Sequence, residues 1–434
     1  MANKSRAEVD NELFDKSSRI TPLKIDVAEF KNIDYFGLKN DKSALKKFTK
    51  LVQDKLLDLN EAWITRLNNP KELLRERMTL FWANHFVCRE NNSLLAQQFN
   101  NALREHALGN FRDITKVVSK EAAMIKYLNL KQNRKQNPNE NFARELMELF
   151  TLGKGNYSEE DIKESARAFT GYNHNFKGEF QFRRFQHDYG KKTFFKRTGN
   201  FNGDDIIDII LLEKQCARFI CEKVYRYFVN TNINNNHVES MVDVFYPKYD
   251  IESLMRFVFM SEWFYEEVNI GTKIKSPIDL LVGLNNEIPL QFEEQKHLLA
   301  LQKMLGQILL RPPNVAGWKG GKKWIDSNTI LLRMRLPSLL LNNAHISTKE
   351  RGEFNDRLNN FIKRRKGNFV PFKTKHDWKH FEKEYAAVSI DGLQDFLLMA
   401  IPSAETQKFL NELGKTSKQQ YCIQLMSLPE YQMC

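Results

Sequence analysis

Charged side chains recur one helical turn apart in residues 139–153. At roughly 100° per residue, one arc of a helix about 140° wide holds all the polar side chains of this stretch. They are Glu140, Asn141, Arg144, Glu145 and Glu148. Arg144 lies one turn from both Glu140 and Glu148, so we expect it to be buried and paired with one of them. This ladder helix (residues 139–153) is either a solvated row of ion pairs or a carboxylate–guanidinium cluster at the floor of a site.

The candidate catalytic groups are carboxylates and an imidazole. They are Glu145 and Glu148 on the ladder helix, with His187 and Asp188 in a loop further along the chain. A buried face rich in carboxylates needs cationic or imidazole partners, and Glu145 and His187 could serve as a general acid and base. Adjacent His and Asp residues are common by chance, so a structural role for His187 and Asp188 is the alternative.

A divalent metal is a second hypothesis for the same region. Imidazole nitrogens and carboxylate oxygens suit Zn, Mn or Fe, and the candidate ligands are His85, His187 and Asp188. No His-Glu-x-x-His spacing supports such a site, and a hydrogen-bonded core position is the alternative for His85. The sequence contains no phosphate loop or dinucleotide fingerprint, so we expect no nucleotide cofactor.

Residues 311–318 form a loop made rigid by two prolines, which fix φ and restrict their neighbours. With Trp324, this loop offers a guanidinium, an amide and two indoles, groups that suit a sugar ring or a peptide. The candidate binding residues are Arg144, Lys191, Arg311, Asn314, Trp318 and Trp324. We expect one convergent site, in which the loop residues His187, Asp188 and Lys191 meet Glu145, Glu148 and His85. Arg311 and Trp318 would close one side of it. The alternative is a buried connector with both tryptophans in the core.

The elements that carry these residues are predicted to be helices. Glycine (19) and proline (12) are scarce in 434 residues, and apolar residues recur at helical spacing. The fold class is therefore mainly α: a large multi-helix single domain with one short β-hairpin near residues 176–185 and a helical C-terminal part. We expect an irregular segment at 1–41, a helical core domain at 42–336, a basic polar segment at 337–380, and C-terminal helices packed on the core at 381–434.

Composition excludes several classes of protein. No run of about 18 apolar residues could span a membrane, and the N-terminus has no apolar secretion signal. The chain as written is therefore expected to be cytoplasmic, with export of a longer form as the alternative. The five cysteines are odd in number and scattered, which argues against a disulfide framework. The formal charge of +12 is concentrated late in the chain, where acidic residues are interspersed and no nucleic-acid motif occurs.

Several blocks of this sequence together resemble a bacterial family called domain of unknown function 1800. They include Phe-Trp-Ala-Asn-His-Phe at 81–86 and His-Asp-Tyr-Gly-Lys-Lys-Thr-Phe at 187–194, and they fall in the family's order. The full set comprises residues 81–86, 139–153, 155–161, 166–171, 187–194, 311–318 and 324–327. The resemblance implies a mostly helical protein and no particular activity. It also implies a neighbour: members are often encoded beside proteins of domain of unknown function 1501, which resemble alkaline-phosphatase-like hydrolases.

Three functions remain open on the sequence. The first is a binding or assembly partner, with the alkaline-phosphatase-like neighbour as the candidate protein. The alternative is a hydrolase with a polar pocket of Glu, His and Asp side chains, with or without a metal. A weaker third is nucleic-acid binding through the basic C-terminal third, which includes Lys363, Arg364, Arg365 and Lys366.

Overall fold

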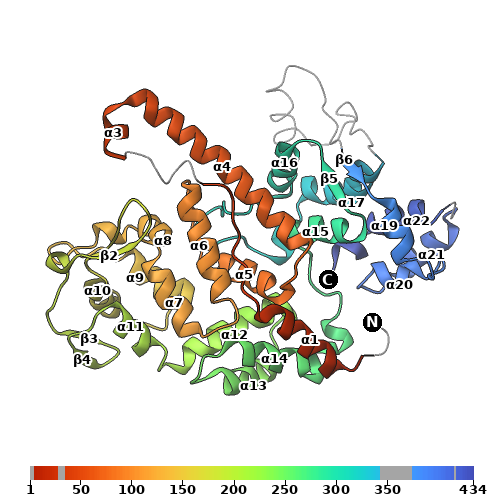
Figure 1. Ribbon diagram of the computed structural model, residues 1–434. Coiled ribbons are helices and arrows are strands. Elements are labelled where there is room, and N and C mark those ends of the chain that lie inside the picture. The colour runs from red at the N-terminus through yellow and green to blue at the C-terminus, as the bar shows by residue number, and fades with distance from the viewer. Residues whose placement is uncertain (1–3, 28–34, 343–373, 415–416) are drawn as a thin grey trace. The chain divides into compact units, whose positions relative to one another are not determined.

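The computed structural model describes residues 4–27, 35–342, 374–414 and 417–434 (Figure 1). Over these residues the protein is mainly helical, which confirms the predicted fold class, and the strands form short antiparallel pairs. None of the helices in this part of the chain is both long and apolar enough to cross a membrane. The chain forms two compact units, Met1–Phe264 with Leu310–Trp318 and Tyr265–Leu309 with Lys319–Cys434. This division differs from the single helical core expected at 42–336.

The first unit begins with a helix where the sequence predicted an irregular segment. Ser5 and Glu8 form a capping box at its start, which fixes α1 as a helix despite its weak apolar pattern. The first elements of this unit are α1 (Arg6–Ser18), α3 (Tyr35–Asn40), α4 (Lys42–Asn68), α5 (Leu73–His85), α6 (Ser93–Glu105), α7 (Phe111–Lys120), α8 (Ala122–Tyr127) and the 3-10 turn η1 (Leu130–Gln132). Glu121, whose backbone is extended, separates α7 from α8.

The ladder helix is a short α-helix followed by a wider turn. α9 (Asn141–Glu145) continues directly into the π-helix η2 (Leu146–Thr151). The Leu152 amide donates to the Met147 carbonyl, five residues back, at 2.9 Å. π-Helical turns are rare in proteins, and those that occur are often found at functional sites. The turn therefore marks the ladder helix as a region of interest.

Strands follow the ladder region, as the sequence predicted. Ser158 and Asp161 form a capping box at the start of α10 (Glu159–Ala168). β1 (Tyr172–His174) then pairs with β2 (Phe180–Phe182), so that Tyr172 faces Phe182 and His174 faces Phe180. The 3-10 turn η3 (Arg184–Gln186) follows. A second pair, β3 (Lys192–Phe194) with β4 (Arg197–Gly199), was not predicted.

Four further α-helices and a 3-10 turn complete the first unit. They are α11 (Gly203–Ile210), α12 (Lys214–Phe228), α13 (Asn235–Phe245), α14 (Ile251–Met260) and η4 (Glu262–Tyr265). Apolar side chains of α5 to α14 form one continuous core, with Trp82, Phe86 and Phe111 among its fully buried rings.

The second unit is also helical. Its elements are η5 (Glu267–Asn269), α15 (Pro277–Glu287), β5 (Leu290–Phe292), α16 (Gln295–Leu305), η6 (Gly321–Trp324), α17 (Ser327–Leu341), β6 (Thr374–His376), α19 (Trp378–Glu384), α20 (Leu393–Leu397), α21 (Ala404–Glu412), α22 (Lys418–Met426) and η7 (Glu430–Gln432). β5 pairs with β6. Of the predicted basic segment at 337–380, most lies outside the described residues, including its Lys363–Lys366 cluster.

Candidate functional sites

Arg144 pairs with carboxylates, but it is not buried. Its Nη2 lies 3.1 Å from Glu140 Oε2 and 3.0 Å from Glu159 Oε2. The pairing with Glu140 is as predicted, whereas the predicted burial is wrong, since 37% of the Arg144 side chain is exposed. The partner added by the fold is Glu159, at the start of α10, rather than Glu148. This end of the ladder helix is therefore a part-exposed ion-pair network.

Glu145 and Glu148 occupy different environments on the same face. Glu145 is half-buried, and burial, followed by the nearby charge of Glu148, raises the pKa of its carboxyl group. In the described structure no hydrogen-bond donor contacts the Glu145 carboxylate. Glu148 instead accepts a hydrogen bond from Tyr157 Oη at 2.9 Å. Burial and this contact raise the pKa of Tyr157 to about 12. Among the described residues, the Glu148 carboxylate is therefore held by a hydrogen bond, whereas the Glu145 carboxyl group is not.

The far end of the π-helix is held by Lys223 and His85. Lys223 Nζ donates to the Leu149 carbonyl at 2.7 Å and lies 3.1 Å from His85 Nδ1. His85 Nε2 lies 3.0 Å from the Phe150 carbonyl, so this nitrogen carries the proton. Burial lowers the pKa of Lys223 to about 7, and burial with the Lys223 charge lowers that of His85. His85 therefore contacts the ladder region as a hydrogen-bonded core residue.

His187 and Asp188 belong to a separate network that ties their loop to α10. His187 Nδ1 donates to the Thr170 carbonyl at 2.8 Å, and burial lowers the pKa of the ring. Asp188 accepts from Arg167 Nε at 2.8 Å, and Arg167 in turn donates to Glu164 at 2.6 Å. The Arg167 guanidinium lowers the pKa of Asp188. These contacts favour a structural role for His187 and Asp188, which was the alternative to a catalytic role.

The predicted metal ligands are not assembled. Among the residues that the structure describes, no group of three or more His, Cys, Asp or Glu side chains could hold a metal ion. His85 is committed to the Phe150 carbonyl and Lys223, whereas His187 and Asp188 are committed to Thr170 and Arg167.

The proline-rich loop (residues 311–318) is anchored at its C-terminal end, where Trp318 is buried. The Trp318 amide donates to Asn84 Oδ1 at 2.8 Å, and Asn84 Nδ2 donates back to the Trp318 carbonyl. This places Trp318 beside the end of α5. Asn314 caps its own turn through the Ala316 amide at 2.9 Å. Trp324 is buried in the second unit. The remaining binding candidates, Arg311 and Lys191, have no side-chain partner within the described residues.

The loop around β1 and β2 exposes a group of aromatic rings, which we name the hairpin surface. It comprises Phe176, Phe180, Phe182, Phe185 and Tyr189. Phe185 is 93% exposed. The rings of Phe180 and Phe182 pack edge-on against the buried Tyr172, and Tyr189 packs edge-on against His187. The His187–Asp188 network thus fixes the base of this surface. Alternation in the sequence predicted the hairpin, but not that its rings remain exposed.

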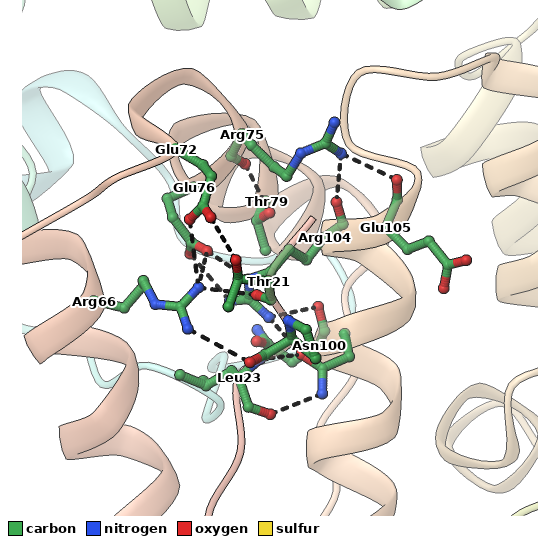
Figure 2. A network of polar contacts seen from close by, with 12 residues as sticks. Thr21, Leu23, Arg66, Glu72, Arg75, Glu76, Thr79, Asn100, Arg104 and Glu105 are labelled. Atoms are coloured by element: carbon green, nitrogen blue, oxygen red, sulfur yellow. Dashed lines mark hydrogen bonds and ion pairs between the residues drawn. The ribbon is translucent and has the colours of Figure 1, made fainter. Parts of the chain in front are cut away.

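The most deeply buried ion pair was not predicted. Arg104 of α6 makes a bidentate contact with Glu76 of α5, with Nε to Oε1 at 2.5 Å and Nη2 to Oε2 at 3.0 Å. Arg66 joins from α4, 3.3 Å from Glu76. Figure 2 shows the side chains of Arg66, Glu76 and Arg104 converging, whereas the Arg75 guanidinium points away from them and donates to the carbonyls of Arg104 and Glu105. The signal in the sequence was the charged run Arg75-Glu76-Arg77, which lies between apolar residues near the start of α5.

Comparison with known proteins identifies the family. The family model described as "Protein of unknown function (DUF1800)" matches residues 2–433. The chain belongs to this family. The match covers essentially the whole chain, beyond the span of the blocks that first indicated it. No curated protein and no solved structure matches this DUF1800 chain.

Proposed function

We propose that this DUF1800 protein is a binding module that docks a partner protein on the hairpin surface. The observation that carries the proposal is a group of exposed aromatic rings, including Phe185 and Tyr189, on a base fixed by buried hydrogen bonds. Contiguous exposed apolar patches mark interaction sites, and aromatic residues are enriched in the central part of protein interfaces. A rigid base lowers the entropy lost on binding.

The family resemblance supplies the first partner to test. A protein of domain of unknown function 1501 would be purified and titrated into this chain by calorimetry. The proposal predicts a stable complex that Phe185→Ser weakens by roughly tenfold or more, as for an interface hot spot. Phe409→Ser, which removes an exposed ring from α21 in the second unit, is the matched control and should leave the affinity unchanged. An equal loss in both variants, or no complex, would contradict the proposal.

A hydrolase is the second candidate, and Glu145 is the observation that favours it. A carboxyl group whose pKa is raised by burial is suited to act as a general acid. In this candidate, Glu145 would protonate a leaving group, while Glu148, held by Tyr157, would activate water. No metal is required. The described residues define no oxyanion donor for this candidate, so we rank it below the binding module.

The hydrolase candidate is tested with chromogenic ester, phosphate and glycoside substrates. Turnover that is lost in Glu145→Gln at an unchanged melting temperature would establish it. The control Glu160→Gln removes an exposed carboxylate from the first turn of α10 and should not change turnover. Turnover that is the same in all three proteins would rule out Glu145 as the acid.

A further inference from the structure

The hairpin surface is bordered by unpaired cations. The exposed basic side chains around it are those of Lys135, Lys177, Arg183, Arg184 and Lys191. Backbone contacts place them at this border. The Lys135 amide donates to the Gln186 carbonyl at 2.8 Å, and the Lys177 carbonyl lies in the turn between β1 and β2, where it accepts from Gln98. In the described part of the chain, none of these basic side chains has an ion-pair partner.

Carboxylates near the same surface do not neutralise it. Asp188 is already paired with Arg167 at 2.8 Å. Glu179, in the hairpin, accepts a hydrogen bond from Asn175 Nδ2 at 2.6 Å and has no basic partner in the described structure. The border therefore carries a local excess of positive charge around apolar rings. Such a surface attracts negative charge over several ångströms in water of low salt.

We infer that the hairpin surface recognises an acidic segment of a partner protein, one that carries an apolar side chain between carboxylates. The inference rests on the proposed function and names the chemistry of the partner. The apolar side chain would pack beside Phe185, the most exposed ring. Flanking carboxylates would pair with Arg183 and Arg184, whose planar guanidinium groups bind carboxylates in a bidentate manner. Complementary charge would set the orientation and the association rate.

Nucleic acid fits this surface less well, although it is also anionic. Binding of single strands depends on flat aromatic faces on which successive bases stack. Here Phe180 and Phe182 pack against Tyr172 at 73° and 86°, and Tyr189 packs against His187 at 83°. None of these three contacts is a parallel stack, so the described rings do not form a row of stacked plates beneath the surface.

A second copy of the chain and a membrane are also less suitable occupants. The chain has a formal charge of +12, so two cationic borders of the same kind would repel each other. Insertion into a membrane interface needs a broad apolar face. The rings of Phe180 and Phe182 are instead held down on Tyr172, and Phe185 alone is almost fully exposed.

The test uses fluorescence anisotropy with defined probes and the full chain. The probes are a labelled peptide of alternating glutamate and leucine, the same peptide with glutamine for each glutamate, a labelled oligothymidylate, and vesicles of phosphatidylglycerol. We expect the glutamate peptide to bind most tightly and to weaken as salt rises. Arg183→Gln with Arg184→Gln should weaken its binding by about tenfold. The control, Lys322→Gln with Lys323→Gln, removes the same charge from an exposed turn of the second unit and should have little effect.

The outcomes separate this inference from the proposed function. If both peptides bind equally and Phe185→Ser abolishes both, the hairpin surface binds protein but does not select acidic segments, and only the inference is overturned. If the oligothymidylate or the vesicles bind more tightly than the glutamate peptide, the inference is also overturned, in favour of that class of ligand. If the two double variants weaken the glutamate peptide equally, the attraction comes from net charge and the inference fails. If no probe binds, an acidic segment is not a ligand of this surface and the inference fails, while binding of the partner protein by calorimetry still tests the proposed function separately.

Discussion

At the scale of residues, burial separates ion pairs that look alike in the sequence. Glu76 and Arg104 are each 1% exposed and form two hydrogen bonds across α5 and α6. Arg144 and Glu159 also lie close together, but Glu159 is 71% exposed. An exposed pair contributes about 0–1 kcal/mol, whereas loss of one partner from a buried pair leaves an uncompensated charge.

We therefore predict that Glu76→Gln strongly destabilises the protein. The Arg104 guanidinium would remain buried without its carboxylate, at a cost of about 3–5 kcal/mol. The matched control is Glu159→Gln, which removes the exposed partner of Arg144 and should cost about 0–1 kcal/mol. Chemical denaturation of both variants measures the difference. Equal free energies of unfolding would mean that burial does not distinguish the two pairs.

The sequence predicted which side chains share a helix face, but not how deeply they lie. The pairing of Arg144 with Glu140 follows from helical spacing, which is a local property. Its exposure depends on α10, whose position is set by contacts between distant residues. The same holds for His187 and Asp188, which were expected to meet the ladder helix and instead bond to Thr170 and Arg167. Convergence between loops is a tertiary property that spacing does not encode.

At the scale of elements, the π-helix η2 ends on buried polar side chains. Lys223 and His85 bond to the carbonyls of Leu149 and Phe150. Local sequence does not predict this turn, because the ladder pattern is compatible with an ordinary α-helix. The partners of its last carbonyls lie on α5 and α12, far away in sequence. The fold class and most helix positions were predicted, since they depend on periodicity and capping.

Lys223 makes the stability of this region depend on pH. Burial lowers its pKa to about 7 in the folded state, from the ordinary value of 10.5. The unfolded chain therefore binds more protons between these values, and stability should rise as pH increases from about 7 to 10.5. Lys223→Met should remove that part of the rise. Lys214→Met, from an exposed position on the same helix, should keep it. Melting curves across this pH range that coincide for all three proteins would contradict the account.

Gly171 controls the entry to the hairpin. Its φ is +86°, and an added Cβ would lie 2.8 Å from the Arg183 carbonyl oxygen. We predict that Gly171→Ala lowers stability by more than the roughly 1–3 kcal/mol of backbone strain alone. Gly155→Ala isolates that strain, because Gly155 has φ of +87° and nothing within 4 Å of the added atom. Equal melting temperatures for the two variants would contradict the prediction, because the backbone near Arg183 could then shift to accept the added Cβ without a loss of stability.

At the scale of the whole molecule, the described chain separates structural polar groups from exposed ones. The first unit uses its buried charges to join α4, α5 and α6 and to fix the loop beneath the hairpin. Its aromatic rings at the hairpin surface, by contrast, have no covering element in the described structure, and cations border them. This distribution is the reason for favouring a binding module over a hydrolase.

Radical footprinting of the chain with the proposed partner protein tests that central claim most directly. Oxidation of Phe185 and Tyr189 would be quantified by mass spectrometry with and without the protein of domain of unknown function 1501. Phe409, exposed in the second unit, is the internal control. The account predicts that labelling of Phe185 and Tyr189 falls in the complex while that of Phe409 is unchanged. Unchanged labelling of Phe185 in a complex that protects other residues would contradict it.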